Sequence, residues 1–408
     1  MSLPLDGVRI LDFTIMMQGP HGTMMLGDLG AEIIKVERPA RLGGPSGRPD
    51  ERYGRHGGYG KNPEENTWYA SSFIAHNRNK KSLTIDLKHP KGREIILRLV
   101  KACDVLYENF RPGAMDRLGL GYEDCRRLNP SIVYASATGY GPDGPYVHRP
   151  GQDLIAQALS GIAAMNAPAG GRPTQVAISL SDLLGAMYGA YGVLAALYHR
   201  QRTGEGQRVN VCLLDSSIAA LSEMAVHCLN TSVEPKRGSE MHALPFIPSP
   251  YGIYKTADGY LTISGSQTVP KLSEILGVPD LTKDPRFDTF WKRVNNRAEM
   301  DAVIEEATKK KTTAAWMELM EKADLWASPV HTFPQAFSDP QALHNEMILT
   351  IDTPVGPLKM PGFPYKLSQT PAQVRMPPPL LGQHTEEILQ SIGYSSDEIR
   401  HLEEAEVI

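Results

Sequence analysis

Residues 8–38 read VRILDFTIMMQGPHGTMMLGDLGAEIIKVER, and this stretch decides the fold class. Its hydrophobic pattern predicts a strand over 8–13, a helix over 21–30 that ends in glycine, and a second strand over 31–38. The alternation continues with strands expected at 82–87, 104–110 and 132–141, and a helix at 90–103. Short strands that alternate with helices predict an α/β fold, with a Rossmann-like, mainly parallel sheet covered by helices on both faces.

Outside this alternating region the chain changes character. The segment between 38 and 81 is rich in glycine and basic residues, and we expect a long loop there. A hairpin is expected over 249–265, followed by helices near 268–276, 297–308 and 314–323. We therefore expect a large domain over 1–224 and a smaller α+β domain over 225–330. A proline-rich segment over 331–408, with a last helix near 385–392, would return to the large domain.

The overall composition excludes several classes of function. The 408 residues carry a net charge of −4, so no basic surplus is available for nucleic-acid binding. Four cysteines lack CxxC spacing and twelve histidines lack an HExxH motif, so we expect no disulfide framework, no metal site and a cytoplasmic location. No secretory signal is expected. The apolar stretch 176–198 carries polar residues in its first third, which favours a buried helix over a membrane span.

The turn after the first strand tests for a dinucleotide site. It reads MQGPHG over 17–22, which lacks the GxGxxG pattern, and Pro20 has no amide to offer a pyrophosphate. Glu37 closes the second strand, where an acid that binds ribose would stand. An NAD-dependent oxidoreductase is therefore the weaker alternative.

Basic residues gather near the predicted strands and indicate a different phosphate ligand. Ligands of open α/β sheets lie beyond the carboxyl ends of the strands, so charges from separate strands can converge there. A solvated surface explains any one of these residues, but the set favours a pocket for a 3′-phosphate and a pyrophosphate. The set comprises Arg38, Lys80, Lys81, Lys88, Arg111 and Arg117.

Asp182 begins the apolar helix LLGAMYGAYGVLAALYHR and is the acid at its start. An aspartate in that place commonly caps the helix. The helix dipole also keeps such a carboxylate ionised, and a carboxylate nucleophile needs ionisation together with partial desolvation. Gly185 would allow a ligand or backbone to approach. Both readings, cap and nucleophile, remain open at this point.

Eight ordered motifs give the chain a resemblance to a known family. They are LDFT(x)4GP at 11–20, DLGAEIIKVERP at 28–39, NRNKKSLTIDL at 77–87, DVLYENFRPGAMDRLGL at 104–120, GYGPDGPY at 139–146, QALSG at 157–161, RTGEGQRVNVCLLD at 202–215 and PLLGQHTEEIL at 379–389. The set resembles the CaiB/BaiF family, the family III CoA-transferases, over essentially the whole chain.

The resemblance implies a large α/β domain and a smaller domain in an interlocked homodimer. It implies that Asp182 is the nucleophile and that coenzyme A is a substrate, with no permanently bound cofactor. Residues matching the CoA contacts of the formyl-CoA transferase branch are Met17, Arg38, Ile85, Lys88, Asn109, Phe110 and Arg117. We add Gln18 to this set, because Gln18 or Gln152 could stabilise an oxyanion.

Two departures from the family pattern narrow the reaction. The racemase branch has a histidine before an aspartate where this chain has Gln152-Asp153, and an amide cannot take a proton from an α-carbon. The formyl-CoA branch has a mobile glycine run that is missing from RGSEMHALPFIPSPYG at 237–252. These departures disfavour racemisation and put oxalate chemistry in doubt.

We therefore expect an enzyme that moves CoA from an acyl-CoA donor to a small carboxylic acid through an aspartyl-CoA thioester. The candidate substrate contacts are Arg149, Gln152 and Asp153. The acceptor is expected to be a dicarboxylate, because a second carboxylate could bind Arg149 together with His148, Arg48, Arg52 and Arg55. These arginines would otherwise contact only CoA or solvent. The alternatives are a 2-methylacyl-CoA racemase and a non-catalytic acyl-CoA-binding paralogue, and neither a nucleic acid nor a membrane is an expected partner.

Overall fold

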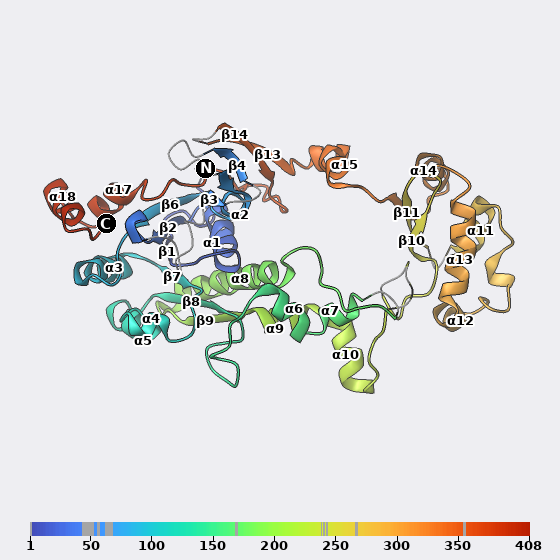
Figure 1. Cartoon of the computed structure of the whole chain (residues 1–408), viewed down its shortest axis with the longest axis horizontal. Helices are drawn as coiled ribbons and strands as arrows, with labels where there is room; N and C mark the ends of the chain where they lie inside the picture. The colour runs from blue at the N-terminus through green and yellow to red at the C-terminus, as the bar shows by residue number, and fades with distance from the viewer. Residues whose placement is uncertain are drawn as a thin grey trace. The chain divides into compact units, whose positions relative to one another are not determined.

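A computed structural model describes residues 2–42, 53–54, 58–61, 68–167, 170–237, 239, 241, 244–265, 268–353 and 356–408 (Figure 1). The chain divides into two compact units. Unit 1 comprises Met1–Ser160, Ile178–Ala220 and Gln341–Ile408, and unit 2 comprises Gly161–Ala177 and Leu221–Pro340. The expected large domain over 1–224 thus includes a segment that belongs to unit 2. That segment is folded on itself, since the Asn166 side-chain amide donates to the carbonyls of Thr174 and Gln175.

Unit 1 is built on a six-stranded parallel sheet with the order β6-β2-β1-β7-β8-β9, which confirms the predicted α/β class. The strands are β1 (Arg9–Asp12), β2 (Glu32–Glu37), β6 (Lys80–Thr84), β7 (Val105–Glu108), β8 (Val133–Thr138) and β9 (Arg208–Cys212). The chain builds β1, β2 and β6 in one direction and then returns to place β7 on the other side of β1. The strand order therefore reverses between β1 and β7, which is where such sheets bind their ligands.

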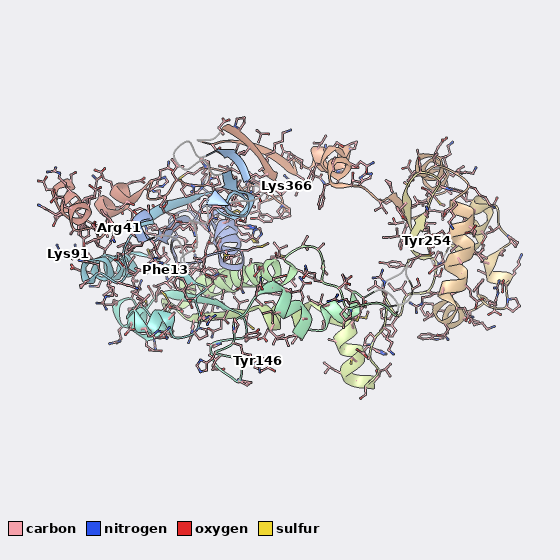
Figure 2. The ribbon with its side chains drawn as sticks, viewed as in Figure 1. Phe13, Arg41, Lys91, Tyr146, Tyr254 and Lys366 are labelled. Carbon is pink, nitrogen blue, oxygen red and sulfur yellow. The ribbon has the colours of Figure 1, made fainter. Side chains whose placement is uncertain are left out.

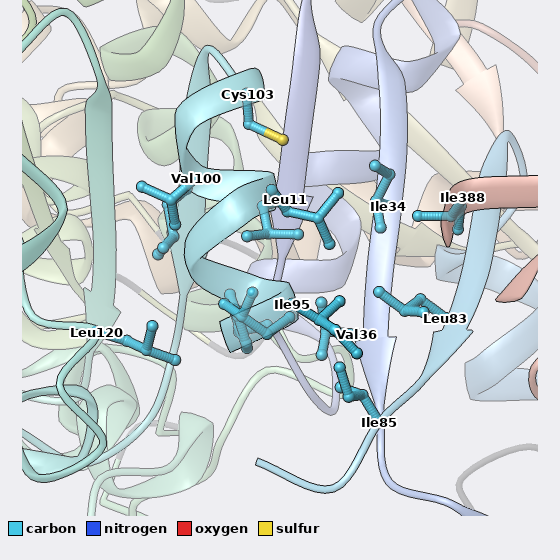
Figure 3. Packing of buried hydrophobic residues seen from close by; sticks show 14 of the residues in the cluster. Leu11, Ile34, Val36, Leu83, Ile85, Ile95, Val100, Cys103, Leu120 and Ile388 are labelled. Carbon is cyan, nitrogen blue, oxygen red and sulfur yellow. The ribbon is translucent and has the colours of Figure 1, made fainter. Parts of the chain in front are cut away.

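Helices cover both faces of this sheet, and the residues of its inner strands β2, β1, β7 and β8 are accordingly mostly buried. The unit 1 helices are α1 (Gln18–Asp28), α2 (Ser71–His76), α3 (Pro90–Ala102), α4 (Ala114–Arg117), α5 (Tyr122–Leu128), α6 (Asp153–Leu159), α8 (Leu180–Thr203), α9 (Leu213–Ala220), α17 (Thr385–Ser391) and α18 (Ser396–Glu404), and α16 (Pro340–His344) spans the boundary with unit 2. On one face, α3 packs Ile95 and Val100 against Leu11, Ile34 and Leu83 (Figure 3).

The opposite face is covered by α1 and α8. Ala190 and Val193 of α8 join Leu26 of α1 in a core cluster with the strands. By length and composition alone α8 could cross a membrane, but its small residues lie against unit 1: a Cβ on Gly22 of α1 would come 3.1 Å from the Ala186 carbonyl oxygen. Small residues at this crossing let the two helix backbones approach closely.

Unit 2 contains the antiparallel sheet β10-β11-β12, whose first two strands form the predicted hairpin. Its elements are α7 (Ile162–Met165), α10 (Ser222–Thr231), β10 (Tyr251–Lys255), β11 (Tyr260–Ser264), α11 (Val269–Leu276), η3 (Leu281–Lys283), α12 (Phe290–Asn295), α13 (Arg297–Thr308), α14 (Thr313–Lys322), β12 (Ala327–Pro329) and α15 (Phe333–Ser338). Tyr254 is wholly buried, and its hydroxyl donates to Asp301 at 2.8 Å (Figure 2).

The sequence reading missed several elements. The expected loop between 38 and 81 contains η1 (Ala40–Leu42), β3 (Tyr53–Gly54), β4 (Gly58–Lys61), β5 (Trp68–Ala70) and α2, and the C-terminal part contains β13 (Ile348–Thr353), β14 (Gly356–Pro361) and α18. The strands β3, β4 and β5 have two to four residues and are too brief to show a period, whereas β13 and β14 have six residues each, and β14 contains two prolines, which are atypical of strands. By contrast, α18 had a readable signal, since Ser395 and Glu398 form a capping box at its start.

Candidate active site

The carboxyl end of β1 is held by a buried ion pair. The Lys80 Nζ lies 3.0 Å from an Asp12 carboxylate oxygen, and both side chains are fully buried. Thr14 and Thr23 donate hydroxyl hydrogen bonds to the same carboxylate, and the Lys35 ammonium donates to the Thr14 carbonyl. Although burial would raise it, the charges of Lys80 and Lys35 hold the pKa of Asp12 below its ordinary value. This network sets the path of the turn that leads to Met17 and Gln18.

The same geometry corrects the predicted phosphate cluster at two positions. Lys80 is engaged by Asp12, and the Lys81 ammonium lies 2.8 Å from Glu32 and 2.6 Å from Glu387. Both lysines begin β6, and their ammonium groups are bound by carboxylates of the protein itself, so they are not available to a phosphate. The sequence alone does not show that Lys80 and Lys81 are paired with carboxylates. Because of these ion pairs, both lysines are excluded from the candidate phosphate site.

The remaining basic residues follow carboxyl ends at one edge of the sheet. Arg38 comes directly after β2, Lys88 follows β6, and Arg111 and Arg117 follow β7. All four are exposed. This edge can therefore present positive charge to an anionic ligand from three strands that lie on both sides of the switch point.

The other predicted CoA contacts differ in how much of their side chains is accessible. Ile85 is fully buried in the core, so only its backbone can meet a ligand, and its amide donates to the Glu37 carbonyl. Asn109 accepts a hydrogen bond from the Ile15 amide and donates one to the Ile15 carbonyl, each at 2.8 Å. Asn109 thus joins the end of β7 to the end of β1 at the switch point. Phe110 is half-buried, and Met17 is the residue that precedes α1.

Asp182 lies in the first turn of α8 and is half-buried. It does not act as the helix cap. The amides of Ser181 and Asp182 donate instead to one oxygen of Asp153, at 2.7 and 3.3 Å, and Gln157 donates to the other oxygen at 2.7 Å. Burial, and then the negative charge of Asp153, raise the pKa of Asp182 to about 6. A carboxylate with this pKa is mostly ionised at neutral pH and more basic than an ordinary aspartate.

An unpartnered amide lies one helical turn from Asp182. A Cβ on Gly185 would come 2.6 Å from the Gln18 Nε2, so this side chain rests directly on the glycine. Gln18 is 6% exposed, and its Nε2 finds no hydrogen-bond partner among the described residues. Because residues i and i+3 share a helix face, this donor is on the same side of α8 as Asp182. A buried donor without a partner is available to a ligand oxygen.

The candidate acceptor residues lie on the segment between β8 and α6. The Arg149 guanidinium stacks over the Tyr146 ring at 3.8 Å, in a loop that projects from the sheet (Figure 2). Arg149, His148 and Gln152 are exposed, and Gln152 directly precedes α6. Arg48, Arg52 and Arg55 lie outside the described residues. The structure thus brings Asp153 beside Asp182 and Gln18 against Gly185, one helical turn away, and among the described residues it records no contact between Arg149 and Asp182.

Two site features escaped the sequence reading. The link between Asn109 and Ile15 and the capping of α8 by Asp153 both join residues far apart in the chain. Asp153 offered one partial signal, since an aspartate at a helix start commonly binds amides. The helix whose amides it binds is not its own, which no local pattern encodes.

Comparison with known proteins places this arrangement in a family. The chain is 38% identical to the mouse (Mus musculus) succinyl-CoA:glutarate CoA-transferase over 95% of its length and 86% of that protein's. It is 34% identical to the succinyl-CoA–D-citramalate CoA-transferase of Chloroflexus aurantiacus, over 99% and 98% of the two chains. A solved CaiB/BaiF family protein from Brucella suis matches with a TM-score of 0.82 at 32% identity, covering 96% of this chain and 100% of that one. Residues 5–385 match the model of CoA-transferase family III, and the chain belongs to this family of enzymes.

Proposed function

We propose that this protein transfers CoA from an acyl-CoA donor, succinyl-CoA being the first to test, to a dicarboxylic acid through a thioester on Asp182. The observation that carries the proposal is the surroundings of Asp182. It is a half-buried carboxylate without a cationic partner among the described residues, and an unpartnered amide of Gln18 lies one turn away. The mouse and Chloroflexus relatives both bear names that pair succinyl-CoA with a dicarboxylic acid.

The reaction divides one exchange of CoA into reversible steps. An Asp182 oxygen attacks the donor thioester carbonyl, the carbon–sulfur bond breaks, and a mixed anhydride and CoA thiolate result. The thiolate then attacks the Asp182 carbonyl and releases the donor acid, which leaves aspartyl-CoA. The acceptor carboxylate attacks that thioester and expels the thiolate. The thiolate attacks the acceptor carbonyl of the second anhydride, which forms the new acyl-CoA and frees Asp182.

Each of these steps places negative charge on a carbonyl oxygen. A donor that is already in place and shielded from water stabilises such charge more than water does. We assign this role to the Gln18 Nε2, since it is buried and unpartnered beside Gly185. Gln152, which is exposed, is the second candidate.

The CoA nucleotide has to remain bound while its sulfur is exchanged. We assign it to the carboxyl edge of the sheet, where Arg38, Lys88 and Arg117 present positive charge from three strand ends. Met17 and Phe110 offer apolar contacts there, and Asn109 holds the β1 and β7 ends together. For the acceptor, Arg149 offers a guanidinium that is stacked on Tyr146 and exposed, suited to a second carboxylate.

We also propose that the protein acts as a homodimer. Several large apolar side chains of α8 are exposed, including Met187 at 54% and Tyr191 at 72%. On α10, Leu229 is 83% exposed. Apolar surface of this kind is common where a second chain binds. Light scattering coupled to size-exclusion chromatography should give twice the mass of 44.8 kDa, and a monomer at assay concentration would contradict this proposal.

The covalent step can be tested directly. The enzyme is incubated with succinyl-CoA, quenched with hydroxylamine, and digested, and the peptide that contains Asp182 is weighed. We expect an aspartyl hydroxamate in the wild type and none in Asp182→Asn. An unmodified peptide from an enzyme that still turns over would overturn the covalent mechanism. A parallel screen of succinate, glutarate and acetate as acceptors, read by mass spectrometry of the CoA products, tests the substrate class.

A further inference from the structure

The first turn of α8 takes its cap from another helix. Ser179 precedes the helix, and its side chain makes no capping hydrogen bond. Asp153, the first residue of α6, supplies the acceptor instead, through the amides of Ser181 and Asp182. Because the first amides of any helix lack partners within it, they bind whichever acceptor lies nearest. Here that acceptor is a second carboxylate.

This arrangement has a consequence for Asp182. A carboxylate that accepts backbone amide hydrogen bonds becomes a weaker base, because the bonds stabilise its charged form. In the part of the chain that the structure describes, no group donates a hydrogen bond to the Asp182 carboxylate. The amides next to it point to Asp153, which also places a negative charge beside it. Both effects keep Asp182 basic.

We propose that Asp153 is a positioning residue that maintains the nucleophilicity of Asp182 by binding the α8 amides and by its own negative charge. The inference rests on the proposed function of Asp182. A more basic carboxylate attacks a thioester carbonyl more readily, provided that it stays ionised at the working pH. The ionised form still predominates at neutral pH, since the pKa of Asp182 is raised to about 6.

Asp153 is itself held in place. The Gln157 Nε2 donates to Asp153 at 2.7 Å and also lies 3.3 Å from the Ile178 carbonyl. Gln157 is fully buried, so the Asp153 carboxylate has little freedom to turn toward solvent. Gln157 is uncharged and therefore fixes the carboxylate without neutralising it.

Among the described residues, Asp153 is the charged group that shifts the pKa of Asp182. Toward the start of α8, α1 presents the uncharged Gln18, and α9 presents Ser217, whose hydroxyl lies 2.8 Å from that of Ser181. The acid of α9, Asp215, is exposed, and the basic residues of α8 lie in its last turn. Burial and Asp153 are the two causes that raise the pKa of Asp182.

The test substitutes Asp153→Asn, which removes the charge and keeps an oxygen that can accept the α8 amides. Asp215→Asn is the matched control, because it makes the same change on α9. Two quantities are followed from pH 4 to 8: the rate of succinyl-CoA turnover, and the infrared carbonyl band of the protonated Asp182. Subtracting the spectrum of Asp182→Asn identifies that band in the free enzyme.

We expect the acidic midpoint of both titrations to move to lower pH in Asp153→Asn and to stay in place in Asp215→Asn. The plateau rate of Asp153→Asn should also fall, while its KM for succinyl-CoA stays near that of the wild type. Unchanged midpoints in Asp153→Asn would overturn the inference, as would a wild-type infrared midpoint near 4. Hydroxylamine trapping on the wild type decides the proposed function separately, since it does not depend on Asp153. A poorly folded Asp153→Asn is replaced by Asp153→Ser, a shorter uncharged acceptor that should move the infrared midpoint in the same direction.

Discussion

Two aspartates of unit 1 have opposite surroundings. Asp12 ends β1 fully buried, with Lys80 at 3.0 Å and two threonine hydroxyls on its oxygens, and its pKa is lowered. Asp182 lies half-buried in the first turn of α8, beside the acid Asp153, and its pKa is raised to about 6. The first carboxylate is stabilised as an anion and has no reason to react. The second is less stabilised as an anion and is therefore a stronger nucleophile. Their surroundings, and not their residue type, thus distinguish a structural aspartate from a candidate nucleophile.

The largest expected effect comes from removing the carboxylate of Asp182. Asp182→Ala should lower kcat by on the order of 10³-fold or more, because it removes the carboxylate that forms the proposed thioester. The measurement is steady-state turnover of succinyl-CoA with glutarate. Asp215→Ala serves as the control, and turnover by Asp182→Ala near the control's rate would contradict the assignment.

Breaking the scaffold pair should instead affect stability. Lys80→Met leaves the Asp12 charge buried without its partner, which costs roughly 3–5 kcal/mol of unfolding free energy. Lys81→Met is the matched control on the next residue, where the ion pairs are partly exposed and a loss of about 0–1 kcal/mol is expected. Denaturant unfolding measures both. Equal losses in the two variants would mean that the Asp12 pair does not stabilise the β1 end.

Filling the space beside Asp182 should displace the Gln18 amide. Gly185→Ala puts a Cβ 2.6 Å from the present Nε2 position, and the flexible side chain has to move. Loss of one oxyanion donor costs about 10²–10³-fold in kcat, and Gln18→Ala should show a similar loss. The double variant should be no slower than the worse single variant, since both remove one interaction. Fully additive losses would indicate that the two residues act separately.

The smallest effect is a gain in stability. The folded pKa of Asp182 lies above its value in the unfolded chain, so the folded state binds the extra proton and loses stability as pH rises through about 4 to 6. Asp182→Asn removes that loss and should be more stable than the wild type above pH 6, by roughly 1–3 kcal/mol, and no more stable below pH 4. Thermal unfolding at pH 4, 6 and 8 tests the sign. A constant difference across this range would show that ionisation of Asp182 is not the cause.

The same contrast shows how far local patterns reach. The strands and the helix of 8–38 could be predicted from the sequence, because their hydrophobic periodicity depends only on residues that are neighbours in the chain. Lys80 and Lys88 looked alike in sequence, since each is a lysine beside the same strand. Their surroundings differ because β6 begins at Lys80, whose ammonium binds Asp12, whereas Lys88 follows the other end of the strand. Lys80 and Asp12 are 68 residues apart, so no local sequence pattern predicts that they pair.

By itself, the sequence determined the parallel α/β sheet, the hairpin of unit 2, the family, and Asp182 as an acid at a helix start. These features depend on hydrophobic periodicity, on turn residues and on ordered motifs, all of which are local. Tertiary structure decided that Asp153 caps α8, that the Gln18 amide rests unpartnered on Gly185, and that Lys80 serves the scaffold. The reactivity of a carboxylate depends on burial and on charges brought together from distant segments, and only the folded chain brings them together.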